Sequence, residues 1–228
     1  GEYRWHYQTT PRDRWDYTAT QQIMLADLPL GENGASRRVV MQAPKNGFFY
    51  VLDAADGELI SATPFTEQNW TTGEFDENGR PVLVEEAVDL ELYAVVPGPS
   101  GAHNWHPMAF NPDTGLVYIP ANEIPFFYDK TRNVEDAKSI WNIGYDSAAG
   151  WPVEYPAGTL DAIADLDGGS LLAWDPVKAE PRWAVPFALP LNGGVLSTDA
   201  GLVFQGNKFG DLVAYDAETG ERLWSHRL

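Results

Sequence analysis

The chain has 228 residues, of which 44% are hydrophobic and 13% aromatic, enough apolar material for a packed core and too much for an intrinsically disordered chain. Its 33 acidic and 15 basic residues give a formal net charge of −18, which repels phosphate backbones and argues against a nucleic-acid partner. With no cysteine and no run of about 18 apolar residues, the sequence predicts neither disulfides nor a membrane span.

The distribution of turn residues predicts an all-β fold. Seventeen prolines and 21 glycines interrupt the chain, and apolar residues hardly ever recur at helical spacing for more than a turn or two. This pattern is typical of many short strands joined by tight turns.

Internal repeats define the expected architecture. Residues 47–61, 169–183 and 210–224 share one pattern of strand, turn and strand, and residues 111–119 and 197–205 share a second hairpin pattern. Two such hairpins make one four-stranded unit. Gly1-Glu-Tyr-Arg-Trp5 matches Gly220-Glu-Arg-Leu-Trp224, so the chain is expected to begin inside one repeat and to end at the same point of another.

Repeats of this kind bury both faces only by stacking, which favours a β-propeller. Units are expected to end near Tyr7, Pro64, Phe187 and Leu228, so the chain supplies about three blades. The segment 121–168 lacks the repeat pattern and is expected to be an insertion loop. A β-sandwich is the alternative fold, and the tryptophans that end two of the three copies, Trp183 and Trp224, weigh against it.

Four polar or aromatic residues near turns are candidates for chemistry, although each also has an ordinary structural interpretation. Asp16, between Trp15 and Tyr17, could be a turn residue, and Lys45 could be a surface charge. Asn104 and Trp105 could be a loop asparagine and a packing tryptophan. His103 and His106 are three apart, but Pro107 argues against a helix there, so a metal site is not expected.

The segments around these residues resemble one known family. They are Ala214 to Trp224, Trp5-His-Tyr-Gln-Thr-Thr-Pro11 followed by Trp15-Asp-Tyr-Thr18, Ala43-Pro-Lys-Asn-Gly-Phe-Phe-Tyr-Val-Leu-Asp53, and Asn104-Trp-His-Pro-Met-Ala-Phe-Asn-Pro112. Together they resemble the quinoprotein and quinohaemoprotein alcohol dehydrogenases, which depend on pyrroloquinoline quinone (PQQ). Residues 1–228 would then be part of an eight-bladed propeller in which tryptophans dock between blades.

The resemblance also implies roles for the candidate residues. Asp16 would be the general base that accepts the proton of the alcohol, and one ligand of a metal ion. Lys45 would contact the quinone oxygens and stabilise negative charge that develops there, so it counts as both catalytic and cofactor-binding. Asn104 and Trp105 would reach the edge of the cofactor through amide and indole N–H groups.

The metal implied by the resemblance is Ca²⁺, with its remaining ligands outside this chain. In lanthanide-using relatives a second aspartate stands two residues after the base, where this chain has Thr18. The resemblance leaves open a haem c group in a separate domain.

By the same resemblance, the protein is a periplasmic oxidoreductase that converts an alcohol to an aldehyde or ketone and passes electrons to a cytochrome c. Its other partners would be the alcohol, which could be a sugar, and the rest of the propeller. The alternative function is a non-catalytic propeller scaffold, like the outer-membrane assembly lipoproteins. Convergence of Asp16, Lys45 and Asn104 would favour the enzyme, because a scaffold needs no such group.

Overall fold

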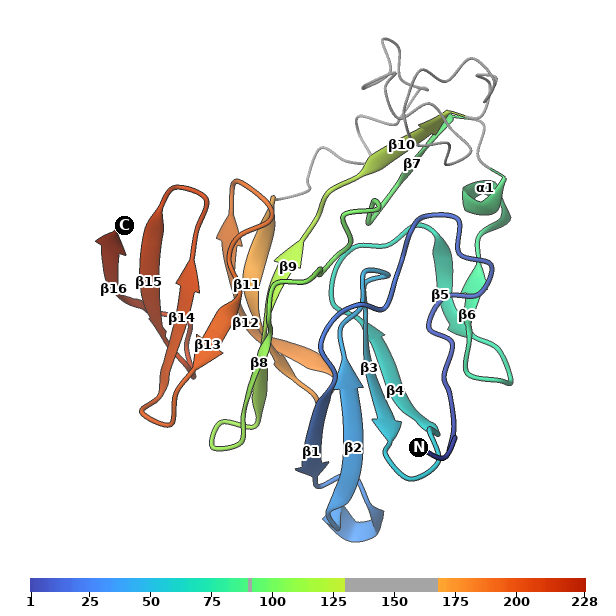
Figure 1. Cartoon of the computed structure of the whole chain (residues 1–228), viewed down its shortest axis with the longest axis horizontal. Helices are drawn as coiled ribbons and strands as arrows, with labels where there is room; N and C mark the ends of the chain where they lie inside the picture. Colours follow the sequence, from blue (N-terminus) through green and yellow to red (C-terminus); the bar gives the residue numbers. More distant parts are fainter. Residues whose placement is uncertain (90–91, 130–167) are drawn as a thin grey trace.

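The computed structural model describes residues 1–89, 92–129 and 168–228, which form three four-stranded antiparallel sheets arranged like a fan (Figure 1). The first sheet contains β1 (Met24–Leu28), β2 (Arg37–Gln42), β3 (Phe48–Asp53) and β4 (Leu59–Pro64) in sequential order. The second contains β8 (Ala109–Asn111), β9 (Leu116–Asn122), β11 (Gly169–Asp175) and β12 (Glu180–Phe187). The third contains β13 (Val195–Ser197), β14 (Leu202–Gly206), β15 (Asp211–Asp216) and β16 (Arg222–Arg227). The all-β propeller architecture is confirmed, and the sheets end close to the expected residues Pro64, Phe187 and Leu228.

Smaller elements lie outside the three sheets. A 3-10 turn, η1 (Glu32–Gly34), joins β1 to β2, and a two-stranded sheet of β5 (Thr71–Phe75) and β6 (Pro81–Leu83) precedes the short helix α1 (Glu85–Val88). In the parts of the chain that the structure describes, no helix has the length and apolar character needed to cross a bilayer.

The structure describes only part of the segment 121–168 that was expected to be an insertion loop. The expected boundary lies inside β9, because Ala121 pairs with Ser170 and Asn122 with Gly169 across the second sheet. Beyond it, β10 (Phe126–Asp129) pairs with β7 (Leu92–Val95) in an antiparallel ribbon that projects from the sheets (Figure 1). Residues 130–167 lie outside the described part.

Burial of both faces of each central strand explains why the sheets stack. In β9, Val117 and Ile119 face the first sheet and pack with Phe49 and Val51, whereas Tyr118 faces the third sheet and packs with Val203. Strand β11 follows the same rule, since Leu172 and Trp174 pack toward the first sheet and Leu171 and Ala173 toward the third. Because successive side chains of a strand point to opposite faces, a continuous apolar strand needs a neighbour on each side.

Docked tryptophans fasten one unit to the next at two positions. The indole N–H of Trp183 donates to the Ala217 carbonyl oxygen at 3.1 Å, and its ring covers Gly220. Trp5 repeats this contact on the first sheet, where it donates to Ala54 at 3.2 Å and covers Gly57. A Cβ atom on either glycine would lie within 2.7 Å of a ring atom, so the tryptophan and the glycine depend on each other.

Gly220→Ala should therefore destabilise the protein for two reasons, the left-handed backbone at this position and the contact with the Trp183 ring. Gly220 and Gly201 both have φ of 74°, a left-handed conformation that is costly for alanine, but only Gly220 lies against a ring. We expect Gly220→Ala to lower the free energy of unfolding by about 1–3 kcal/mol more than Gly201→Ala, as measured by urea denaturation. Equal losses in the two variants would show that the docked ring does not constrain position 220.

Candidate active site

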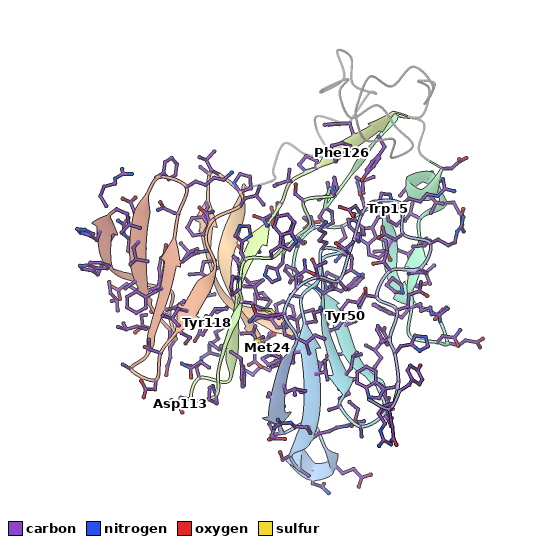
Figure 2. All side chains as sticks on the ribbon, in the orientation of Figure 1. Trp15, Met24, Tyr50, Asp113, Tyr118 and Phe126 are labelled. Atoms are coloured by element: carbon purple, nitrogen blue, oxygen red, sulfur yellow. The ribbon has the colours of Figure 1, made fainter. Side chains whose placement is uncertain are left out.

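The aromatic neighbours of Asp16 fix its position. Trp15 and Tyr17 are buried, while the Asp16 side chain between them remains exposed. The Trp15 indole N–H donates to the Ala87 carbonyl in α1 at 3.3 Å, and the Tyr17 hydroxyl donates to the Pro97 carbonyl. Both rings pack against Trp70, with centroid separations of 5.5 and 5.4 Å, on the side of the first sheet where Figure 2 labels Trp15. Asp16 is therefore held from both sides.

The backbone of Asp16 adopts a left-handed conformation, with φ of 63°. Aspartate tolerates this conformation better than most residues. The carbonyl oxygen and the carboxylate of Asp16 consequently point to the same group, the Lys45 ammonium.

Lys45 lies in the turn that leads into β3, and its side chain is only 6% exposed. Its Nζ atom is 2.9 Å from Asp16 Oδ2 and 3.0 Å from the Asp16 carbonyl oxygen, whereas the Asp16 side chain is 65% exposed. A buried ammonium is costly unless a partner compensates it. The interpretation of Lys45 as a solvated surface charge is therefore wrong, and Asp16 is its compensating partner.

The turn that carries Lys45 is fixed by its next residue. Asn46 is fully buried, and its amide nitrogen lies within hydrogen-bond distance of the Thr9 carbonyl oxygen and of the Thr10 and Tyr50 hydroxyl oxygens, between which its two N–H donors are shared. The Asn46 carbonyl also accepts the indole N–H of Trp70 at 3.0 Å. Asn46 thus holds the Lys45 turn to Thr9 and Thr10, in the segment that precedes Asp16. It also holds this turn to Trp70, the ring that packs against Trp15 and Tyr17.

The loop between β7 and β8 lies directly on Lys45. The Ala102 N–H donates to the Lys45 carbonyl at 2.9 Å, and a Cβ atom at Gly101 would lie 2.4 Å from Lys45 Cγ. Gly101 also has φ of 77°, so both the close approach and the backbone conformation require glycine. The loop that carries Asn104 and Trp105 is therefore adjacent to the Asp16–Lys45 pair.

Asn104 and Trp105 differ in how they are held. Asn104 is buried, its amide donates to the Ser100 carbonyl at 2.8 Å, and its Oδ1 accepts the Trp105 backbone N–H at 2.9 Å. Trp105 is 73% exposed, so its side chain is not a packing residue among the described parts of the chain. The structure thus brings Asp16 and Lys45 into contact and places Asn104 on the adjoining loop, while the Trp105 indole projects outward.

Sequence reasoning missed His103. It considered this residue only as a metal ligand, whereas the ring is buried and each nitrogen lies 2.7 Å from a backbone carbonyl oxygen, that of Ala43 or that of His106. Burial lowers the pKa of His103, although these two carbonyls oppose that shift. Within the described ranges, no group of three or more His, Asp or Glu side chains could hold a metal ion.

Stacked four-stranded sheets, docked tryptophans and a lysine–aspartate pair on the connecting loops define a segment of a β-propeller with a polar site. The family model "PQQ: Glucose/ethanol/alcohol dehydrogenase, beta-propeller domain" matches residues 1–78 and 81–228, and the chain belongs to this family.

Individual relatives match almost the whole chain. It is 48% identical to the quinohemoprotein alcohol dehydrogenase ADH-IIG of Pseudomonas putida, over 98% of this chain and 32% of that protein. It is 43% identical to the 1-butanol dehydrogenase (cytochrome c) of Thauera butanivorans, over 99% of this chain and 32% of that protein. The solved structure of ADHIIG from Pseudomonas putida HK5 superposes with a TM-score of 0.83 at 46% identity, over all of this chain and 34% of that one. The chain thus spans about a third of the length of the relatives it matches.

Tyr17→Phe should reveal how strongly this anchor stabilises the site. The variant loses the donor to the buried Pro97 carbonyl, so we expect the free energy of unfolding at about pH 7 to fall by about 1–2 kcal/mol. Burial raises the pKa of Tyr17 well above its usual range. Its neutral form therefore stabilises the fold fully below the unfolded pKa of about 10, and this contribution is lost as pH rises above that value.

The stability difference between wild type and Tyr17→Phe should consequently shrink above about pH 10. Urea denaturation at a series of pH values measures it, with Tyr3→Phe at an exposed tyrosine as the control. A difference that stays constant up to alkaline pH would contradict the assignment of a buried, neutral phenol at position 17.

Proposed function

We propose that this chain forms part of the active site of a PQQ-dependent alcohol dehydrogenase that oxidises an alcohol to an aldehyde or ketone. The observation that carries the proposal is the contact between the buried Lys45 ammonium and the exposed Asp16 carboxylate. Membership of the PQQ family supports the cofactor, and the names of the relatives support an alcohol as the substrate.

The donor groups at the site suit a quinone that carries carbonyl and carboxylate oxygens. The Lys45 ammonium has three N–H donors, and the described structure directs two of them to Asp16. The remaining donor, with the Asn104 amide and the exposed Trp105 indole, would hold such oxygens. When bound, PQQ supplies the electrophilic ring that accepts hydride from the alcohol carbon.

The role proposed for Asp16 follows from its exposure. One carboxylate oxygen bonds to Lys45, while the side chain stays accessible to a small molecule. Asp16 can therefore accept the hydroxyl proton of an alcohol bound beside it. Lys45 holds the carboxylate in place and adds positive charge where negative charge develops on the cofactor oxygens.

We include Ca²⁺ in the proposal, with Asp16 as one of its ligands. Calcium takes six to eight oxygen ligands, and among the described residues Asp16 does not belong to a group of three or more acidic or histidine side chains, so its other ligands would come from elsewhere in the complete protein. Thr18 is exposed like Asp16, and an aspartate at that position would add a second carboxylate. Its absence favours the divalent ion over a trivalent one.

The complete enzyme would have an electron acceptor, further domains and a cellular location of its own. A cytochrome c would accept the electrons, as the name of the Thauera butanivorans relative indicates for that protein. The proposal includes a periplasmic location, the rest of the propeller as a partner, and haem c in a separate domain. A non-catalytic scaffold is the less favoured function, because it gives no reason to bury an ammonium against an exposed carboxylate.

Asp16→Asn in the complete enzyme should abolish most of the turnover. The amide cannot accept the hydroxyl proton, so we expect kcat to fall about 100- to 10,000-fold, measured as dye-linked alcohol oxidation with saturating quinone and Ca²⁺. Asp27→Asn is the matched control, because Asp27 is a half-exposed aspartate paired with Arg38 at 2.6 Å. Unchanged turnover in Asp16→Asn would remove this residue from the mechanism.

Lys45→Met should weaken the binding of the cofactor. Methionine fills much of the same buried space without the charge, so we expect the Kd of PQQ to rise roughly tenfold to hundredfold, measured by titrating the apoenzyme. Lys178→Met is the control, since Lys178 is an exposed lysine 3.8 Å from Asp175. Unaltered quinone affinity in Lys45→Met would contradict the role proposed for the ammonium.

A further inference from the structure

The His103 ring links two separate pieces of backbone. Its side chain is 1% exposed, Nδ1 lies 2.7 Å from the Ala43 carbonyl oxygen, and Nε2 lies 2.7 Å from the His106 carbonyl oxygen. Carbonyl oxygens only accept hydrogen bonds, so the ring donates to one of them when neutral and to both when doubly protonated. In either state the imidazole is the polar group buried between these two carbonyls.

The two carbonyls belong to the two segments that carry the site. Ala43 stands two residues before Lys45, directly after the end of β2, and His106 directly follows Trp105. His103 therefore connects the turn that presents the ammonium to the loop that presents Asn104 and Trp105.

Further contacts hold His103 itself in place. The buried Gln21 side chain donates from Nε2 to the His103 carbonyl oxygen at 3.0 Å. Gln42 in turn donates to the Gln21 carbonyl at 2.7 Å, which ties this support to β2. His103 is thus held through its backbone carbonyl as well as through its ring, and its position does not depend on its own loop alone.

We propose that His103 is a positioning residue that sets the Asn104–Trp105 loop relative to Lys45 and so preorganises the groups that bind the quinone. The inference rests on the proposed function, because it takes Lys45, Asn104 and Trp105 as the quinone contacts. The buried ring itself would not touch the cofactor. Its effect comes from the ordering cost that a preformed loop avoids when the ligand binds.

The experiment compares substitutions at position 103 in the complete enzyme. His103→Leu keeps an apolar side chain in the buried space but removes both nitrogens, and His103→Gln retains one amide donor. The control is His106→Gln, three residues away on the same loop, because the backbone carbonyl of His106, and not its ring, contacts His103. For each protein, the Kd of PQQ is measured by fluorescence titration of the apoenzyme, together with apoenzyme Tm and KM for the alcohol at saturating quinone.

We expect the Kd of PQQ to rise roughly tenfold in His103→Leu and less in His103→Gln, with His106→Gln unchanged. KM for the alcohol at saturating quinone should stay unchanged in all of them, because the loop position matters for the cofactor. A merely structural histidine would lower Tm without altering Kd, and that result in the folded variants would overturn the inference.

Failure of the variants to fold and failure of the wild-type enzyme to bind PQQ have different consequences. If neither variant at position 103 folds, Gln21→Met, which removes only the donor to the His103 carbonyl, provides the test: a raised Kd supports the inference and an unchanged one overturns it. If the wild-type enzyme itself does not bind PQQ, the proposed function fails, and the inference about His103 fails with it.

Discussion

The structure of the site depends on one buried charge, the Lys45 ammonium. Its side chain is 6% exposed, and an uncompensated cation at such a position would be strongly destabilising. Compensation comes from a residue 29 positions earlier in the chain, through both the carbonyl and the carboxylate of Asp16. The left-handed backbone of Asp16 and the burial of Trp15 and Tyr17 beside it are what bring these two oxygens to the ammonium.

The stacked sheets supply a rigid base for this arrangement. Strands such as β9 and β11 bury side chains on both faces, so each sheet is fixed by its neighbours rather than by its own turns. The site itself lies outside the strands, on the segment before β1 that carries Asp16, the turn before β3 and the loop between β7 and β8, and hydrogen bonds hold the last of these to the first sheet. Loops held in this way can carry polar groups without disturbing the apolar interfaces between the sheets.

Sequence alone could predict the fold because its determinants are local and repeated. One short pattern joins the turn Asp216-Ala-Glu-Thr-Gly220 to Trp224, four residues after it. This pattern predicts the turn, the strand that follows it and a docking tryptophan together. It could not predict that β10 pairs with β7, since residues 126–129 lie in a segment without the repeat and their partner is more than 30 positions away. The contact of Lys45 with Asp16 and the bonds of His103 are also non-local, so no spacing rule reveals them.

Exposure of the carboxylate and burial of the ammonium suit the proposed chemistry better than the reverse arrangement. An exposed carboxylate is open to a small alcohol, whereas a buried one would be shielded from it. A cation acts more strongly on nearby negative charge in a poorly solvated position than in water. In the proposed mechanism Lys45 would stabilise charge on a bound cofactor, and its contact with Asp16 would keep the proposed base beside that charge. One ion pair would thereby serve both the stability of the loops and the proposed reactivity of the site.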